Sequence, residues 1–110
     1  MIIYNVTVKI ESEVAKEWLQ WMKNEHIPEV IHTGLFTHAR ILKLIGHDDE
    51  QGIAYAIQYH CRDMASLEKY QAEFAKELQS KHTERYKDKY VAFRTIMQEL
   101  WTREGDSNNC

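Results

Sequence analysis

The residues best suited to chemistry lie in one short stretch, WLQWMKNEHIPEVIHTG, residues 18–34. This stretch holds Trp18, Trp21, His26 and the only proline of the chain, Pro28. An imidazole titrates near neutral pH and can act as a general acid or base. Because a proline pushes the preceding residue away from helical angles, we expect a helix that ends near residues 24–26, with His26 at its C-terminal end. His26 is therefore the candidate catalytic residue. The alternative is a structural histidine whose positive charge favours the helix C-terminus.

The two tryptophans belong to an apolar stripe. Val14, Trp18, Trp21 and Met22 recur at helical spacing, which predicts one buried face. Trp18 lies in the middle of this stripe, and we expect it in the core. Trp21 is either a core residue or part of the wall of an aromatic ligand pocket, so it is a candidate ligand-binding residue.

Polar side chains share single faces of three predicted strands. Asn5 lies on the same face as Thr7, Gln58 as His60, and His38 as Arg40. Burying a polar group without a partner is costly, so such residues inside a sheet must bond each other, water or a ligand. This reasoning adds four candidate ligand-binding residues: Asn5, Arg40, Gln58 and His60. The pattern does not say which face of each strand points away from the helices.

The possible metal ligands lack convincing partners. Glu29 and His32 form an E-x-x-H pair, but di-iron sites need two such pairs and further glutamates on long helices. His60 and Cys61 are strand neighbours, which point to opposite faces. The chain contains no phosphate-cradling glycine loop, dinucleotide fingerprint or local nucleophile signature. We therefore expect neither a metal site nor a cofactor.

The order of the predicted elements indicates a fold. Residues 2–10 alternate like a strand, Ser12 is a plausible helix N-cap, and Pro28 to Gly34 form a second short helical turn. Asp63 is a plausible cap for a helix whose buried stripe includes Leu67 and Leu78. Further strands are expected over residues 35–46, 53–61 and 89–101. The order β-α-β-β-α-β predicts an α+β, ferredoxin-like fold: one antiparallel sheet with both helices on one face.

Size, charge and composition limit the function classes. The chain has 110 residues, a 44% hydrophobic fraction and a net charge of -3, with 17 acidic and 14 basic residues. We expect one domain over residues 1–101 and a disordered C-terminal tail over residues 102–110. Without a basic surplus, a membrane-length apolar run or a signal peptide, we expect no nucleic-acid partner and no membrane partner. Two cysteines form no disulfide framework, which favours the cytoplasm. The second face of the sheet is too apolar for water, so we expect a homodimer that covers it, with Phe93 or Met97 buried between the copies.

Short motifs in one order extend over residues 1–101. They are YNVTV at 4–8, W-x-x-W-M at 18–22, HIPEV at 26–30, TG-x-F at 33–36, YAIQY at 55–59 and FRT at 93–95. By these motifs the chain resembles the dimeric α/β-barrel superfamily. More narrowly, it is similar to a small bacterial family known only as a domain of unknown function. The resemblance implies the fold and a dimer, and it implies no reaction. The wider superfamily includes small monooxygenases, haem-degrading enzymes, polyketide cyclases and stress-response proteins. In some members a histidine of an H-x-P motif, matched here by His26 and Pro28, lies near the ligand cavity.

These observations lead to one functional expectation and two alternatives. We expect a cytoplasmic homodimer that binds a small apolar or aromatic metabolite between sheet and helices. As an enzyme it would be a cofactor-independent monooxygenase, cyclase or isomerase, with His26 as acid or base and Asn5 or Gln58 orienting a carbonyl. The first alternative is a non-enzymatic structural or regulatory dimer module. The second is a haem-binding protein. Fold alone does not choose among them.

Overall fold

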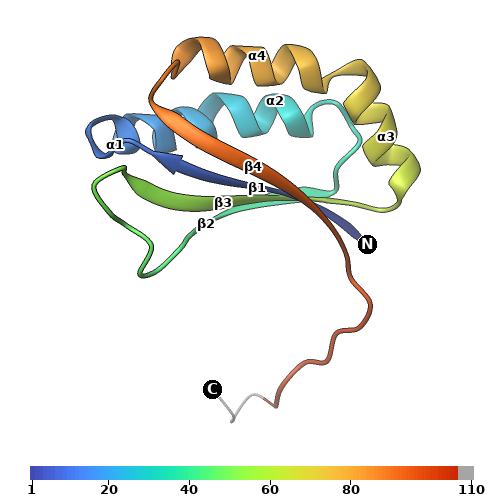
Figure 1. Cartoon of the computed structure of the whole chain (residues 1–110). Helices are drawn as coiled ribbons and strands as arrows, with labels where there is room; N and C mark the ends of the chain where they lie inside the picture. Colours follow the sequence, from blue (N-terminus) through green and yellow to red (C-terminus); the bar gives the residue numbers. More distant parts are fainter. Residues whose placement is uncertain (107–110) are drawn as a thin grey trace.

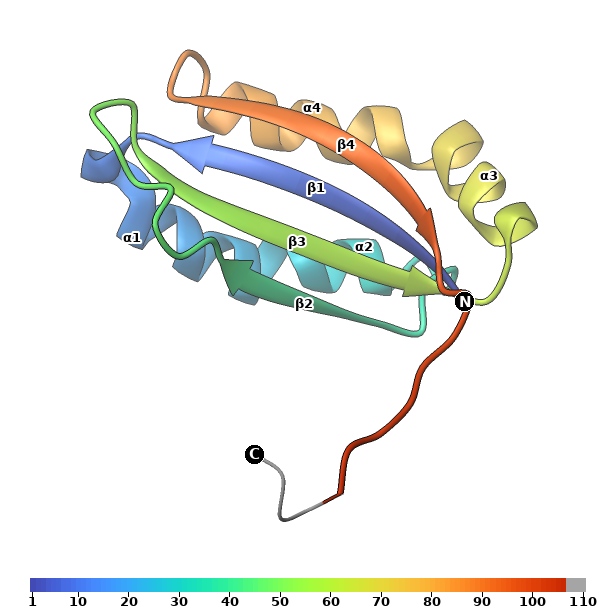
Figure 2. The same ribbon diagram turned by 60° about the horizontal axis from the view of Figure 1, so that its bottom comes forward.

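The structure, a computed structural model, describes residues 1–106 and has the predicted α+β, ferredoxin-like architecture. Along the chain the elements are β1 (Ile2–Ile10), α1 (Ser12–Trp21), the π-helical turn η1 (Met22–His26), α2 (Ile27–Ile31), β2 (His38–Lys43), β3 (Ile53–Cys61), α3 (Met64–Glu73), α4 (Ala75–Arg85) and β4 (Tyr90–Gln98). The strands form one antiparallel sheet in the order β2-β3-β1-β4. All helices cover one face of this sheet and leave the other face bare (Figure 1). Figure 2 shows the strand order from the bare side.

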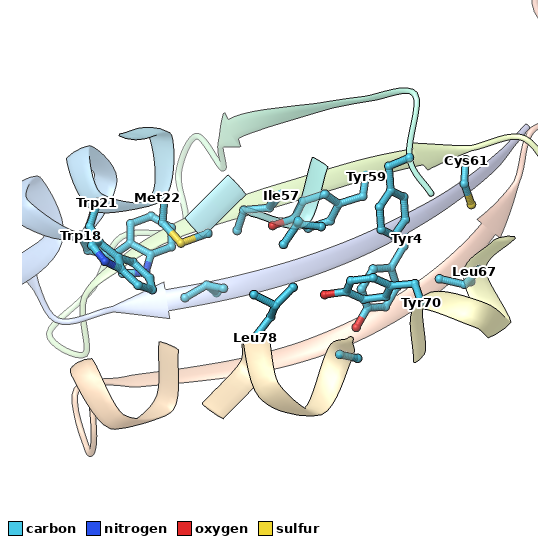
Figure 3. Packing of buried hydrophobic residues seen from close by; sticks show 14 of the residues in the cluster. Tyr4, Trp18, Trp21, Met22, Ile57, Tyr59, Cys61, Leu67, Tyr70 and Leu78 are labelled. Carbon is cyan, nitrogen blue, oxygen red and sulfur yellow. The ribbon is translucent and has the colours of Figure 1, made fainter. Parts of the chain in front are cut away.

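The alternation in β1 correctly divides its two faces. Tyr4, Val8 and Ile10 are buried against the helices. Val6 lies on this same face of β1 and is paired with Ile57, so the face of β3 that carries Ile57 also points toward the helices. The core lies in this layer, with Trp18, Trp21 and Met22 at one end and three tyrosines toward the other (Figure 3).

The predicted helix break near residues 24–26 is wrong. The chain stays helical from Ser12 to Ile31, and five residues, Met22–His26, form a π-helical turn in which Ile27 N–H donates to the Met22 carbonyl. A π turn adds one residue to the helix. This extra residue turns Glu25 out to solvent and brings His26 and Val30 onto the buried face. It also places Pro28 in the first turn of α2, where its missing N–H is tolerated.

The helix caps and the second helical region follow the sequence in part. Asp63 caps α3 as predicted, because its carboxylate accepts a hydrogen bond from Ser66 N–H at 2.8 Å. The predicted cap at Ser12 is wrong by one residue, since Glu11 occupies the N-cap position without a side-chain cap bond. The single predicted helix is two helices, which meet at Phe74 with a φ of -127°. Gly34, at a φ of 81°, ends the first helical region as predicted.

Two strands are shorter than predicted. Strand β2 covers only His38–Lys43 of the expected residues 35–46, and β4 ends at Gln98. Residues 99–106 contain no helix or strand and extend away from the body on the bare side of the sheet (Figure 1). The expected disordered tail includes residues 107–110, with Cys110, which lie outside the described residues. Within residues 1–106, no helix is both long and apolar enough to cross a membrane.

Candidate functional site

A small cavity lies between the helix-facing side of the sheet and the helices. Its volume is about 40 Å³, and it is lined by side chains from the sheet, η1, α3 and α4. Because one water needs roughly 10–15 Å³ by this measure, the cavity holds a few waters at most. The polar groups on its walls are His26, His82, Gln79, Arg94 and the hydroxyls of tyrosines.

A larger groove adjoins the cavity between α4 and β4. Its volume is about 710 Å³, and it shares Tyr4, Gln79 and Arg94 with the cavity. Gln79 Nε2 donates to the Tyr4 hydroxyl at 3.4 Å, at the boundary between the two spaces. A long and poorly held hydrogen bond of this kind is weak. Gln79 and Tyr4 thus mark the side on which the cavity and the groove meet.

His26 is buried in the cavity wall. Only 8% of its surface is exposed, and its ring stacks on Trp21 with centroids 4.9 Å apart and an interplanar angle of 21°. Its Nδ1 is cut off from solvent and has no hydrogen-bond partner within residues 1–106. Burial lowers the pKa of His26 to about 4, against a smaller opposing effect of the Glu29 charge. The expectation of a histidine at a helix end is thus incorrect: His26 is held inside a continuous helical segment.

His82 is a second buried histidine on the cavity, and the sequence reasoning missed it. Trp18 Nε1–H donates to His82 Nε2 at 2.9 Å, and both side chains are buried. Burial, aided by the nearby His26 and Arg94, lowers the pKa of His82 to about 4. A signal was present in the sequence, because His82 follows Leu78 by four residues and so continues the buried stripe of the helix.

Trp21 supports His26 from behind and does not line the cavity. The guanidinium of Arg85 lies 5.3 Å from the Trp21 ring centroid, and Arg85 also binds Glu17. Glu17 accepts a second hydrogen bond from the buried Tyr86 hydroxyl at 2.6 Å. These two bonds lower the pKa of Glu17, while burial and Glu17 together raise the pKa of Tyr86 to about 12. The cluster ties α1 to α4 and fixes the ring on which His26 stacks.

The other four candidate residues lie on the opposite, bare face of the sheet. Asn5 is paired with Gln58 across β1 and β3, Gln58 with Arg40, and His60 with His38. Arg40 Nε donates to Gln58 Oε1 at 3.0 Å. Asn5 is itself buried and donates to the Thr7 hydroxyl at 3.1 Å. The sheet therefore separates these residues from His26, and neither Asn5 nor Gln58 can orient a carbonyl held by His26 in the same protomer.

The bare face also carries a pair of stacked imidazoles. The rings of His38 and His60 lie 4.2 Å apart with an interplanar angle of 17°. His60 Nε2 has no partner within residues 1–106. Burial, followed by the charges of His38 and Arg40, lowers the pKa of His60. This face thus combines polar side chains with exposed apolar ones, which include Leu42, Val91 and Phe93.

The described residues do not assemble a metal site. Within residues 1–106, no group of three or more His, Cys, Asp or Glu side chains is placed to hold a metal ion. Glu29 of the E-x-x-H pair instead binds Lys81 at 2.7 Å. The expectation that the protein needs no metal remains a prediction for elemental analysis.

Several solved structures share this fold at low sequence identity. HapK from Hahella chejuensis has a TM-score of 0.67 and 9% identity over 96% of this chain and 99% of its own. A dimeric ferredoxin-like protein from an uncultured marine organism has a TM-score of 0.60 and 11% identity over 90% and 97%. The hydroxynitrile lyase of Passiflora edulis has a TM-score of 0.55 and 11% identity over 92% and 97%. At such identities these similarities establish the ferredoxin-like fold and no activity.

Sequence comparison places the chain more narrowly. No curated protein sequence matches it. The model of a domain of unknown function, DUF4286, matches residues 1–100 and so spans nearly the whole chain. The protein therefore belongs to the DUF4286 family.

Proposed function

We propose that the protein is a homodimer in which each protomer binds the polar end of a small molecule in the cavity beside His26. The observation that carries this proposal is the buried Nδ1 of His26, which has no partner within residues 1–106. Leaving such an atom unpaired costs roughly 1–3 kcal/mol. A ligand group that forms a hydrogen bond with Nδ1 recovers this free energy. An apolar side chain at position 26 would fill the same space without this cost.

The dimensions of the two spaces define how a ligand fits. The cavity of about 40 Å³ accepts only a small polar group, and the adjoining groove of about 710 Å³ accepts the rest. We propose that a ligand entering from the groove displaces the hydrogen bond between Gln79 and Tyr4, two residues that line both spaces. Aromatic and aliphatic walls with a few polar anchors are typical of metabolite pockets.

The homodimer is supported by the bare sheet face. Val91 and Phe93 are 65% and 63% exposed on adjacent outward positions of β4. Apolar groups of this size on a flat sheet favour coverage by a complementary surface, and a two-fold copy is the simplest one. Two structural relatives are described as dimeric, which agrees with this arrangement.

The chemistry that fits the site is proton transfer without a cofactor. With pKa values lowered to about 4, His26 and His82 are both neutral at pH 7. A neutral imidazole can accept a proton, but a pKa of about 4 makes it a weak base, so we expect proton transfer only where the bound ligand raises this pKa. This agrees with a cyclase, an isomerase or a cofactor-independent monooxygenase. Cys61, a buried free thiol, agrees with the cytoplasmic location that we propose.

The small cavity volume favours a non-enzymatic dimer module over a haem-binding protein as the alternative function. A non-enzymatic dimer module, with only water beside His26, is the second candidate function. It is favoured because the aromatic side chains around the cavity leave little free space. The cavity beside His26 and His82 is too small for a haem macrocycle, and no histidine among residues 1–106 lines the adjoining groove, so the two spaces do not support the haem-binding alternative.

A thermal-shift screen tests the proposal. Phenols, aromatic acids and small ketones at millimolar concentration are added to wild-type protein, His26→Ala and His32→Ala, the last an exposed control one residue beyond α2. We expect at least one compound to raise the Tm of wild type and His32→Ala but not of His26→Ala. If no compound raises the wild-type Tm, the dimer module is the better description.

A further inference from the structure

The hydrogen bond from Trp18 fixes the proton of His82. An indole N–H is only a donor, so His82 Nε2 must accept with its lone pair. The neutral ring therefore carries its proton on Nδ1, which makes no hydrogen bond within residues 1–106. His82 lines the cavity, and Nδ1–H is the one donor that its neutral ring can offer to an acceptor there.

His26 stands next to this donor. The two imidazole centroids are 5.8 Å apart, and both side chains are at least nine-tenths buried. No hydrogen bond fixes the proton position of His26 within the described residues, and its Nδ1 is unpaired. His82 can thus only donate a hydrogen bond to a ligand, whereas His26 can accept one. A hydroxyl or carbonyl oxygen between them matches this pair.

The groove outside the cavity carries positive charge. Arg94 and Lys76 line it, and no Asp or Glu is among its lining residues in the described chain. Arg94 forms no ion pair within residues 1–106 and also reaches the cavity wall. A guanidinium in this setting recognises a carboxylate with two parallel hydrogen bonds.

We infer that the cavity and groove bind an aromatic carboxylate with a hydroxyl or keto oxygen at the end remote from the acid. The oxygen accepts the hydrogen bond of His82 Nδ1–H beside His26, the ring lies against Tyr4, and the carboxylate pairs with Arg94. This inference rests on the proposed function, since it names the ligand class of the same cavity.

Three matched probes test the two ends of the ligand separately. They are 4-hydroxybenzoate, benzoate without the hydroxyl, and 4-hydroxybenzamide without the charge, each titrated into the wild-type protein by calorimetry. We expect 4-hydroxybenzoate to bind about tenfold or more tightly than either analogue, the loss expected when one strong polar contact is removed.

Two variants and their controls assign these contacts. Arg94→Gln should lose the preference for 4-hydroxybenzoate over 4-hydroxybenzamide, whereas Arg62→Gln, an exposed control, should keep this preference. His82→Gln should lose the preference for the hydroxyl, whereas His47→Gln in the hairpin loop should keep it. If His82→Gln fails to fold, ¹⁵N spectra of wild-type histidines replace it: the His82 signals should show the Nδ1–H tautomer and shift with 4-hydroxybenzoate but not with benzoate.

The outcomes separate this inference from the proposed function. Equal binding of all three probes, or binding of another compound from the screen when none of the three binds, overturns the inference and leaves the small-molecule site in place. An Nε2–H tautomer of His82 also overturns it. Binding of no compound at all overturns both.

Discussion

At the scale of single residues, the site depends on keeping two imidazoles neutral inside the core. His26 and His82 are buried among aromatic rings, and the nearby His26 further lowers the pKa of His82. The hydrogen bond from Trp18 is a second reason why His82 stays neutral, because a protonated imidazole has no lone pair left to accept this bond. The pair is therefore a source of acid sensitivity as well as a candidate site.

This burial predicts the direction of pH dependence. An unfolded histidine titrates near 6.5, whereas His26 and His82 titrate at about 4 in the folded protein. Between these pH values the unfolded chain binds more protons, so the free energy of unfolding falls as the pH drops from 6.5 to 4 and levels off below. Lowering the pH from 7 to 5 should reduce the free energy of unfolding by about 2 kcal/mol for each of these two residues.

Urea unfolding at the two pH values measures this effect. His82→Gln should reduce the difference between pH 7 and pH 5 by about 2 kcal/mol, the share of one histidine. His47→Gln, at an exposed loop position, should leave the difference unchanged. The same pH dependence in His82→Gln and wild type would show that His82 is not held neutral.

At the scale of elements, the π-helical turn decides which residues reach the cavity. It turns Glu25 to solvent, His26 inward and Val30 into the core. It also separates Pro28 from the regular helix before it. In a continuous α-helix the proline ring would clash with the carbonyl four residues earlier.

Deleting one residue of the turn tests this account. Removal of Asn24, an exposed residue of η1, should convert the segment to a regular α-helix with Pro28 in its interior. We expect a loss of about 3 kcal/mol in the free energy of unfolding. Combining the deletion with Pro28→Ala should recover most of it. If the combined variant is no more stable than the deletion alone, the turn does not serve to accommodate the proline.

The same turn shows why sequence reasoning succeeded with the fold and only partly with the site. Alternation in β1 and the cap at Asp63 are local patterns with one reading, and both were correct. Glu25 within the stripe and Pro28 beyond it fit either a break or a π turn, and only packing distinguishes these. Asn5 and Gln58 were placed on the correct shared faces, but which face meets the helices depends on how the chain crosses the sheet.

At the scale of the whole molecule, one layer of helices on one side of the sheet leaves the other side to the proposed partner (Figure 2). On the bare face, Phe93 of the edge strand β4 lies beside Thr7 of β1. Buried between two copies, this ring would be an interface anchor of the kind that dominates binding free energy.

A charge at this position should separate the copies. Phe93→Glu should weaken self-association roughly 30-fold or more, the equivalent of an interface hot spot of about 2 kcal/mol. Ile45→Glu is the control, since Ile45 is 83% exposed in the hairpin loop and off the sheet face. Sedimentation analysis over a dilution series measures both. A Phe93→Glu protein that associates like the wild type would place the interface elsewhere.

The stacking of His26 on Trp21 has an optical consequence. A charged imidazole in contact with an excited indole quenches its emission, whereas a neutral one quenches far less. Trp21 is therefore an internal fluorophore whose brightness follows the proton on its neighbour. The indole of Trp18, bonded to His82, offers a second emitter of different polarity in the same layer. Fluorescence from the native chain should thus follow the protonation of His26 without an attached dye.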